Sequence, residues 1–284
     1  MPLLGAHMSV AGGLHLAFER IREVRGRALQ IFTKNQLQWN AGPIDPTSVE
    51  KFRQSWEEAG WIPVAAHDSY LINLAAVDAS VAERSVKAFA EEINRCEALG
   101  IRYLVAHPGS HRGDGIERGL DRFTANLDRS LQMAKANTVN VLIEITAGQG
   151  SSLGSSFEEI AHILAFSQHR GILGVCFDTS HAFAAGYDLR NAQTYRDTFA
   201  QFDRIIGIGR IKFFHLNDSK GECGSRIDRH EHIGKGKIGL EGFRLLLNDP
   251  RFRNHPMVLE TPKGKDLKND RKNLRTLRSL MAVQ

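Results

Sequence analysis

Histidine, aspartate and glutamate residues end many of the short apolar segments that are spread along this chain. Seven segments end in such a residue, namely His7, His67, His107, Glu144, Asp178, His215 and Glu260. Imidazole and carboxylate groups bind divalent metal ions, and a mixture of both without cysteine is typical of a catalytic zinc site rather than a structural one. The residue types therefore predict a metal centre, provided that the fold brings the segment ends together.

Two closely spaced pairs enlarge this set. Asp178 and His181 are three residues apart, so the first turn of a helix would place both side chains on one side. Asp228 and His230 are separated by one residue, so an extended backbone would point both in the same direction. The four carboxylates of the enlarged set against three Zn²⁺ ions leave a charge of about +2, or about +1 with a bridging hydroxide. More than one metal ion and a phosphodiester substrate are therefore indicated.

The elements that must position these residues are eight strand-like segments, which alternate with stretches whose apolar residues have helical spacing. This alternation predicts a parallel sheet, and eight strands can close it into a (β/α)8 barrel. We expect one α/β TIM-barrel domain over residues 1–284, with the metal site at the C-terminal face of the strands. The expected strands are 3–7, 28–32, 62–67, 103–107, 139–144, 173–178, 211–215 and 257–260.

Several helices have recognisable ends. Asp45 is a suitable N-cap before Pro46, and Gly60 and Gly100 are suitable C-terminal stops. Segment 218–237 is rich in glycine and charge and is expected to form one long loop after the seventh strand, where a long loop is often functional. The expected helices include 46–59, 79–99, 119–136, 156–168 and 240–247.

The composition is that of an ordinary globular protein, with 42% hydrophobic and 24% charged residues. No apolar run reaches the roughly 18 to 20 residues of a membrane helix and the N-terminus lacks a signal pattern, so we expect a cytoplasmic protein without membrane contact. Cys96, Cys176 and Cys223 are scattered and are expected to be reduced and structural. The net charge of +5 suits a polyanionic partner. No association helix is evident, which favours a monomer.

Nine short motifs follow one another along the chain, most of them around the residues named above. They read GAHMSVAGGL from Gly5, FTKNQLQW from Phe32, AHDSYLINLA from Ala66, HPGSH from His107, IEITAGQG from Ile143, DTSHAFAAGYD from Asp178, HLNDSK from His215, DRHEHIGKG from Asp228 and LETP from Leu259. In this order they resemble the endonuclease IV family of abasic-site endonucleases, and the resemblance covers essentially the whole chain.

The resemblance implies a trinuclear zinc cluster whose nine ligands correspond, residue by residue, to those found from segment ends and spacing. Mn²⁺ is an alternative at one position. His7 lies outside the ligand set and is expected to hold a ligand or water by a hydrogen bond. The first zinc would be held by His67, His107 and a bridging Glu144, the second by Glu144, Asp178, His215 and Glu260, and the third by His181, Asp228 and His230.

The implied activity is hydrolysis of the phosphodiester 5′ to an abasic site in duplex DNA, which leaves a 3′-hydroxyl and a 5′-deoxyribose phosphate. Removal of 3′-blocking groups is expected as well. A hydroxide bridging two zincs would attack the phosphorus, with Glu144 and Glu260 as the catalytic carboxylates. The resemblance also places Leu37, Tyr70 and Leu71 in the DNA, because apolar wedges unstack a duplex most easily where a base is missing.

Three residues depart from the commoner family pattern. Leu37 stands where some members carry arginine, which predicts an apolar wedge with less phosphate attraction. Ile145 replaces a polar residue next to the bridging glutamate, which predicts the loss of a hydrogen bond near the cluster. Ser180 replaces a cysteine. The roles of His111 and His232, which lie near the expected mouth, stay open.

Two other classes of function must be separated from this one. A sugar isomerase or epimerase of the xylose-isomerase-like barrels also gathers carboxylates and histidines around divalent ions, and the fold alone does not exclude it. A free sugar would not require the Asp228 and His230 pair or the Tyr70 and Leu71 wedge. A non-enzymatic DNA-binding module with structural zinc would be expected to use cysteine ligands.

Overall fold

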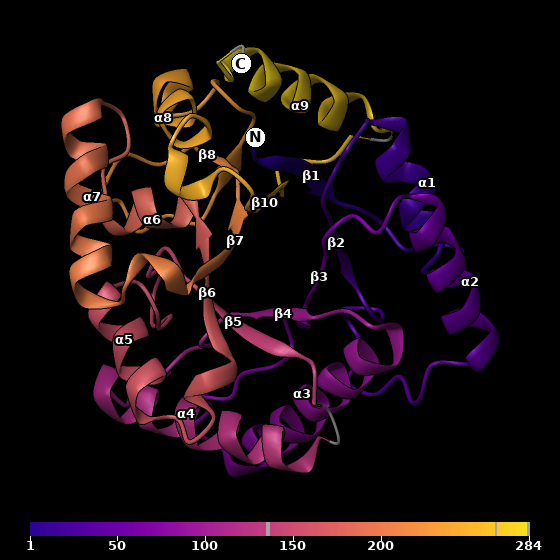
Figure 1. Cartoon of the computed structure of the whole chain (residues 1–284). Helices are drawn as coiled ribbons and strands as arrows, with labels where there is room; N and C mark the ends of the chain where they lie inside the picture. Colours follow the sequence, from indigo (N-terminus) through magenta and orange to yellow (C-terminus); the bar gives the residue numbers. More distant parts are fainter. Residues whose placement is uncertain (135–136, 265, 283–284) are drawn as a thin grey trace.

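The strands of the chain close into a parallel barrel, as their alternation with helices predicts. The computed structural model describes residues 1–134, 137–264 and 266–282. Within these ranges the barrel order is β1-β10-β7-β6-β5-β4-β3-β2, and β2 pairs with β1 to close the ring (Figure 1). The strands are β1 (Leu3–His7), β2 (Leu29–Phe32), β3 (Val64–His67), β4 (Tyr103–Ala106), β5 (Asn140–Glu144), β6 (Leu173–Asp178), β7 (Ile211–His215) and β10 (Pro256–Leu259).

All neighbouring barrel strands run parallel, so their C-terminal ends share one rim. The register places Asp178 opposite His215, and Glu144 opposite Cys176. Most expected strand bounds agree with the structure to within a residue. His107 and Glu260, expected as last strand residues, follow β4 and β10 by one residue. Both still lie at the rim because the chain has only just left the sheet.

Helices surround the barrel (Figure 1). The cap interactions agree with the sequence: Asp45 Oδ2 accepts a hydrogen bond from Ser48 N at 3.0 Å, and Gly100 ends its helix with a left-handed φ of 81°. The expected helix 119–136 begins earlier, at Ile116, and its expected end at residue 136 lies outside the described residues. The helices are α1 (Leu16–Glu23), α2 (Pro46–Glu58), α3 (Ala79–Leu99), α4 (Ile116–Met133), α5 (Phe157–Phe166), α6 (Thr179–Ala185), α7 (Ala192–Ile205), α8 (Gly239–Leu247) and α9 (Lys268–Leu280), with short 3-10 turns η1 (Arg170–Ile172), η2 (Ile208–Arg210) and η3 (Pro250–Phe252).

The barrel interior consists of an apolar layer below a polar one. The buried apolar layer is Ala28, Ala65, Val105, Leu142, Cys176, Phe213 and Val258. Side chains two residues apart on a strand share a face, so the residue two positions after each of these also faces the barrel interior. These residues form the polar layer: Gln30, His67, His107, Glu144, Asp178, His215 and Glu260.

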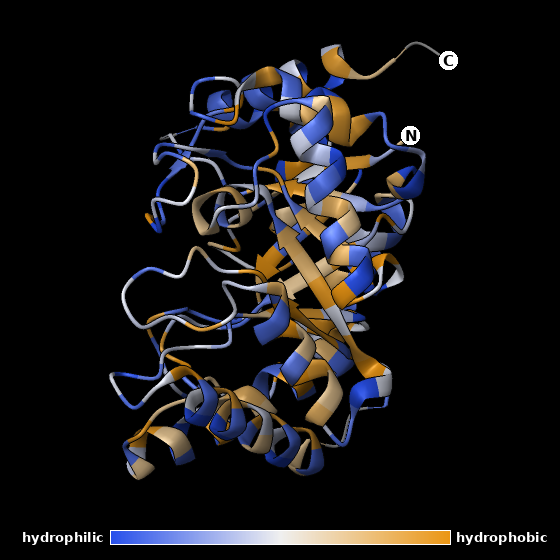
Figure 2. Cartoon of the chain, turned by 90° about the vertical axis from the view of Figure 1, so that its left-hand side faces the viewer, coloured by the Kyte–Doolittle hydropathy of each residue, from blue (hydrophilic) through white to orange (hydrophobic). Residues whose placement is uncertain are grey.

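Loops project from the rim where the strands end, on the side away from the N-terminus (Figure 2). Segment 218–237, expected as a single loop, contains a small antiparallel pair, β8 (Asp218–Ser219) and β9 (His230–Glu231). Two-residue strands are too short to give a sequence signal. Of the helices in the described residues, none is both long enough and apolar enough to cross a bilayer.

Candidate metal centre

The nine expected ligand residues lie together at the C-terminal rim of the barrel. Six of them end or directly follow barrel strands, His181 lies in the first turn of α6, and Asp228 and His230 come from the segment that contains β9. The close contacts between their side chains fall into three groups that share members, and Asp228 joins the third through its contacts with His181 and His230. Each group offers a separate position for an ion.

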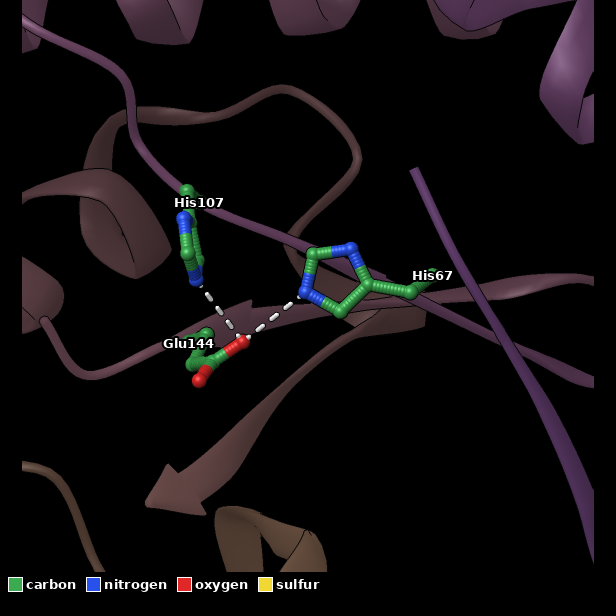
Figure 3. A group of neighbouring side chains, drawn as sticks. All are labelled: His67, His107 and Glu144. Atoms are coloured by element: carbon green, nitrogen blue, oxygen red, sulfur yellow. Dashed lines mark hydrogen bonds and ion pairs between the residues drawn. The ribbon is translucent and has the colours of Figure 1, made fainter. Parts of the chain in front are cut away.

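The first group joins the ends of β3, β4 and β5. His67 Nε2 and His107 Nε2 each lie 3.1 Å from Glu144 Oε2, as Figure 3 shows. The other ring nitrogen of His67 lies 2.9 Å from the backbone oxygen of Asp68. Since a backbone oxygen only accepts hydrogen bonds, His67 Nδ1 carries a proton, and the lone pair that the ring offers when it is neutral lies on Nε2.

The second group lies around the other oxygen of the same glutamate. His215 Nδ1 lies 3.0 Å from Glu144 Oε1, 3.2 Å from Glu260 Oε2 and 3.7 Å from Asp178 Oδ2. Glu144 therefore uses one carboxylate oxygen in each of the two groups. A carboxylate with this arrangement can bridge two cations.

The third group joins α6 to the segment that contains β9. His181 Nε2 lies 3.2 Å from Asp228 Oδ1 and 3.3 Å from His230 Nε2, while His230 Nε2 lies 3.8 Å from Asp228 Oδ1. Asp178 also approaches, with Oδ2 3.8 Å from His230 Nε2. The i,i+3 spacing of Asp178 and His181 and the i,i+2 spacing of Asp228 and His230 thus bring these side chains together as expected.

The tautomers of His181 and His230 show that the third group fits a cation. His181 Nδ1 lies 3.0 Å from the backbone oxygen of Ile145, and His230 Nδ1 lies 3.2 Å from that of Glu260. Both Nδ1 atoms therefore carry protons, so the lone pairs that the rings offer when neutral are those of the Nε2 atoms, which face each other beside a carboxylate. Ligands bound about 2.0 to 2.1 Å from a tetrahedral zinc lie roughly 3.3 Å apart. Two of the three distances, 3.2 and 3.3 Å, match this separation, and the third, 3.8 Å between His230 Nε2 and Asp228 Oδ1, is longer.

The electrostatics of the site favour positive charge at its centre. Burial alone would lower the pKa of His67 and of His181, but the carboxylates facing them raise both well above the ordinary value. Burial alone would raise the pKa of Glu144, but the surrounding imidazoles hold it well below its usual range. Against the same effect of burial, His181 and His230 lower the pKa of Asp228 to about 2. The carboxylates stay ionised, and protons and metal ions compete for the imidazoles.

Cys176 also lies near the second group, with its sulfur within 4.8 Å of ligand atoms of Glu144 and His215. Burial raises the pKa of this thiol well above its ordinary value, and the surrounding carboxylates raise it further. The Cys176 side chain is fully buried and belongs to the cluster of apolar residues inside the barrel. Cys176 is therefore best described as part of the apolar layer, in agreement with a structural role.

Gln30 is a polar member of the site that the sequence analysis missed. This fully buried side chain accepts a hydrogen bond from His215 Nε2 through its Oε1 atom at 2.8 Å, and its amide donates to Glu260 Oε1 at 2.6 Å. The first bond fixes the proton of His215 on Nε2 and leaves the Nδ1 lone pair for the second group. His7 Nδ1 lies 3.2 Å from the same oxygen of Glu260, so His7 contacts a ligand candidate as expected. A glutamine inside the apolar strand LQIF was the available signal.

Asn217 and Asp218 fix the chain after β7. Asn217 Nδ2 donates to Asp178 Oδ2 at 2.6 Å, and its Oδ1 accepts from the backbone N–H of Glu260 at 2.8 Å. Asp218 is buried and accepts backbone N–H groups on both carboxylate oxygens, which ties β8 to the chain that follows β9. Its donors are the N–H groups of Ser219, Gly234, Gly236 and Ile238, at 2.9 to 3.0 Å.

The three expected DNA-contacting residues lie on the loops after β2 and β3. Leu37 and Tyr70 are exposed by 74% and 64%, which is unusual for such large apolar and aromatic side chains, and Leu71 is half-buried. Tyr70 also lines a pocket of about 190 Å³ together with His107, His181 and Asp228. The exposed side chains therefore stand beside the candidate ligands at one opening.

Two further histidines near the rim, His111 and His232, make structural contacts. His111 Nδ1 accepts from the backbone N–H groups of Gly113 and Gly115, and His232 Nδ1 accepts from Asn273. Both rings thus have partners outside the three groups, although His232 lies two residues beyond a ligand candidate.

Unlike the exposed Leu37, the other two departures from the family pattern, Ile145 and Ser180, are fully buried. The side chain of Ile145 is fully buried in the apolar core, so this residue contributes to the site through its backbone oxygen, which faces His181. The hydroxyl of Ser180 is buried and has no hydrogen-bond partner among the described residues. The hydrogen bond whose loss the sequence predicts at position 145 would therefore be one made by the side chain, while the backbone oxygen keeps its contact with His181.

The comparisons with known proteins define the class and then the family. The sequence pattern described as "Xylose isomerase-like TIM barrel" matches residues 18–280, so the chain belongs to that class of barrels. A "Probable endonuclease 4" of Chloroflexus aggregans is 50% identical over all of this chain and 99% of its own length. Another, from Geobacter sulfurreducens, is 49% identical over 98% of this chain and 94% of its own length. The chain therefore belongs to the endonuclease 4 (endonuclease IV) family, which confirms the resemblance.

Solved structures agree with this assignment. The crystal structure of endonuclease IV from Thermus thermophilus superimposes with a TM-score of 0.88 at 37% identity and covers 98% of both chains. A D-tagatose 3-epimerase-like protein also superimposes, with a TM-score of 0.74 over 97% of this chain and 96% of its own, but at only 19% identity. That second likeness shows the shared barrel alone, so it gives no support to a sugar-converting activity.

Proposed function

We propose that this chain hydrolyses the phosphodiester 5′ to abasic sites in duplex DNA and leaves a 3′-hydroxyl and a 5′-deoxyribose phosphate. The observation that carries the proposal is the set of converging carboxylates and imidazole lone pairs at the rim, in a chain about 50% identical to proteins named endonuclease 4. Removal of 3′-blocking groups belongs to the same proposal, because it requires hydrolysis of a phosphoester at the same position.

We assign three zinc ions to the three groups of ligands. Imidazole and carboxylate donors without thiolate suit Zn²⁺, with Mn²⁺ as an alternative at one position. When bound, the ions would supply an activated water and stabilise the negative charge that develops on the phosphate. The proposed holders are His67, His107 and Glu144 for the first ion, Glu144, Asp178, His215 and Glu260 for the second, and His181, Asp228 and His230 for the third.

Glu144 and Glu260 are the proposed catalytic carboxylates. Glu144 is fully buried and divides its two oxygens between the first and second groups, so it fixes their separation. Glu260 presents Oε2 to the second group at 3.2 Å from His215 Nδ1, while Gln30 and His7 hold its other oxygen. A carboxylate with one oxygen fixed in this way keeps the free oxygen in place throughout the reaction.

Leu37, Tyr70 and Leu71 are the proposed contacts to the DNA interior. An exposed leucine and tyrosine can enter the base stack, and the cost of opening a duplex is lowest where a base is absent. The net charge of +5 favours association with a polyanion. The small pocket beside Tyr70 would receive the sugar and phosphate at the opened position.

The test uses purified chain and a duplex with a single abasic-site analogue, with an intact duplex of the same sequence and a ketose sugar as controls. We expect a nick 5′ to the lesion alone. Conversion of the sugar without nicking would overturn the proposal. Glu260→Gln is expected to retain the fold and to lower nicking by orders of magnitude, and Tyr195→Phe, which removes the hydroxyl that donates to Asp249 at 2.8 Å, serves as a variant outside the site.

A further inference from the structure

The loop between β2 and α2 presents Leu37 at the tip of a fixed turn. Gln38 N donates to Asn35 O at 3.0 Å, and Leu37 N donates to Asn35 Oδ1 at 3.0 Å. Lys34 connects the two sides of the turn, since its Nζ donates to Trp39 O at 2.8 Å. The leucine side chain itself is 74% exposed and adds little to the core. The position of this side chain is therefore set by polar contacts of the loop.

Helix α3 holds the beginning and the end of this loop. Arg95 Nε donates to Thr33 Oγ1 at 3.1 Å, a terminal guanidinium N–H donates to Gly42 O at 2.7 Å, and another donates to Thr33 O. Thr33 Oγ1 in turn donates to Glu92 Oε2 at 2.5 Å. One arginine thus connects two points of the chain that are nine residues apart.

The anchor is made of buried charges. Lys34 Nζ lies 3.6 Å from Glu92 Oε1 and 3.7 Å from Glu91 Oε1, and the side chains of Lys34 and Glu92 are only 2% and 1% exposed. Burying ions is costly unless they are paired and hydrogen-bonded, so such a network adds little net stability. It does penalise every loop arrangement that leaves one of its charges without a partner.

A further hydrogen bond joins this loop to the one after β3. Ser69 Oγ donates to Gln36 O at 2.7 Å, and Ser69 Oγ also accepts a hydrogen bond from Leu71 N at 3.3 Å. Gln36 directly precedes Leu37, and Ser69 directly precedes Tyr70. The two loops that carry the proposed DNA contacts are therefore fixed to each other as well as to α3.

We propose that Thr33, Lys34, Glu92 and Arg95, joined through Ser69 to the neighbouring loop, are positioning residues that hold Leu37 and Tyr70 as one preformed wedge for the lesion. This inference rests on the proposed function. A loop that is already ordered loses less conformational freedom on binding DNA than a mobile loop, so the network strengthens binding. It leaves the chemical step unchanged, because it acts on the wedge and not on the metal ligands.

The experiment measures kcat and KM for nicking of the abasic duplex by Arg95→Met and Ser69→Ala, with the zinc content of each variant. We expect KM to rise about tenfold in Arg95→Met and about threefold in Ser69→Ala, while kcat and zinc content stay within about twofold. Tyr195→Phe is the matched control, since it removes one side-chain hydrogen bond in α7, across the barrel from α2 (Figure 1). Its KM is expected to equal that of the wild type.

A double-mutant cycle distinguishes positioning of the wedge from general destabilisation. In a background that carries both Leu37→Ala and Tyr70→Ala, Ser69→Ala should add little to KM, because both wedge side chains that it positions are already gone. Fully additive effects, an unchanged KM in Ser69→Ala, or a parallel loss of kcat and zinc would each overturn the inference. If Arg95→Met does not fold, the KM of Ser69→Ala alone tests the inference. A wild-type chain that fails to nick the lesion would instead overturn the proposed function, and this inference with it.

Discussion

Replacing Gln30 by methionine is expected to weaken zinc binding by about two orders of magnitude. Methionine keeps the length of the buried side chain but removes the hydrogen bond from His215 Nε2 at 2.8 Å and the one to Glu260 Oε1 at 2.6 Å. The first is worth about 1 kcal/mol, and the second, to a carboxylate, about 2 kcal/mol. The sum of about 3 kcal/mol corresponds to a factor of roughly 100 in affinity. Partners of metal ligands generally contribute 10- to 100-fold, which agrees with this value.

The assay is a zinc titration against a chromophoric chelator, with circular dichroism of each variant to verify the fold. Thr198→Val is a suitable control, because it also removes one buried hydrogen bond, to Asp188 O at 3.1 Å, but in α7 away from the rim. We expect the control to bind zinc as the wild type does. A Gln30→Met variant that is folded and binds zinc within about twofold of the wild type would refute the role assigned to this residue.

Further predictions concern the loop after β7, acid stability, salt and metal removal. Asp218→Ala leaves four backbone N–H groups without their acceptor and should cost about 3 kcal/mol in urea unfolding while zinc content falls by about one ion. Burial alone would raise the pKa of Asp249, but Arg251 and Tyr195 lower it below its usual value. Its carboxylate therefore stabilises the fold above about pH 4, and this contribution is lost as the pH falls through the lowered native pKa. In urea unfolding, the wild type should lose its advantage over Asp249→Asn below pH 4, and a constant difference would contradict this. Leu37→Arg should steepen the salt dependence of DNA binding by about one phosphate contact, and an unchanged slope would show that position 37 lies away from phosphates. Chelation should abolish nicking and lower Tm, with both restored by zinc, and an unchanged Tm would argue against ions bound to the native state.

The barrel and most of the candidate site could be predicted from the sequence because strand ends in a closed parallel barrel share one rim. Once the strands were placed, residues as distant as His67 and Glu260 had to approach each other. The pairs formed by Asp178 with His181 and by Asp228 with His230 could be predicted for a different reason. Their local spacing alone places the two side chains of each pair on the same side of the backbone.

Other parts of the site depend on tertiary contacts that leave a weak trace in the sequence. Gln30 was missed because its strand ends in the apolar Phe32, although its position two residues after Ala28 places it in the polar layer. Asn217 lies beyond its strand, so its direction depends on how the chain turns there. Strands β8 and β9 are formed around the buried carboxylate of Asp218, and a pattern of two residues gives no periodicity to read.

The decisive measurement for a zinc-dependent nuclease is the metal content of the purified, active chain, obtained by mass spectrometry on the same sample that is assayed for nicking. We expect about three zinc ions per chain, a lower content in His230→Ala, and nicking in proportion to occupancy. A chain that nicks abasic DNA at full rate with no bound transition metal would contradict this expectation.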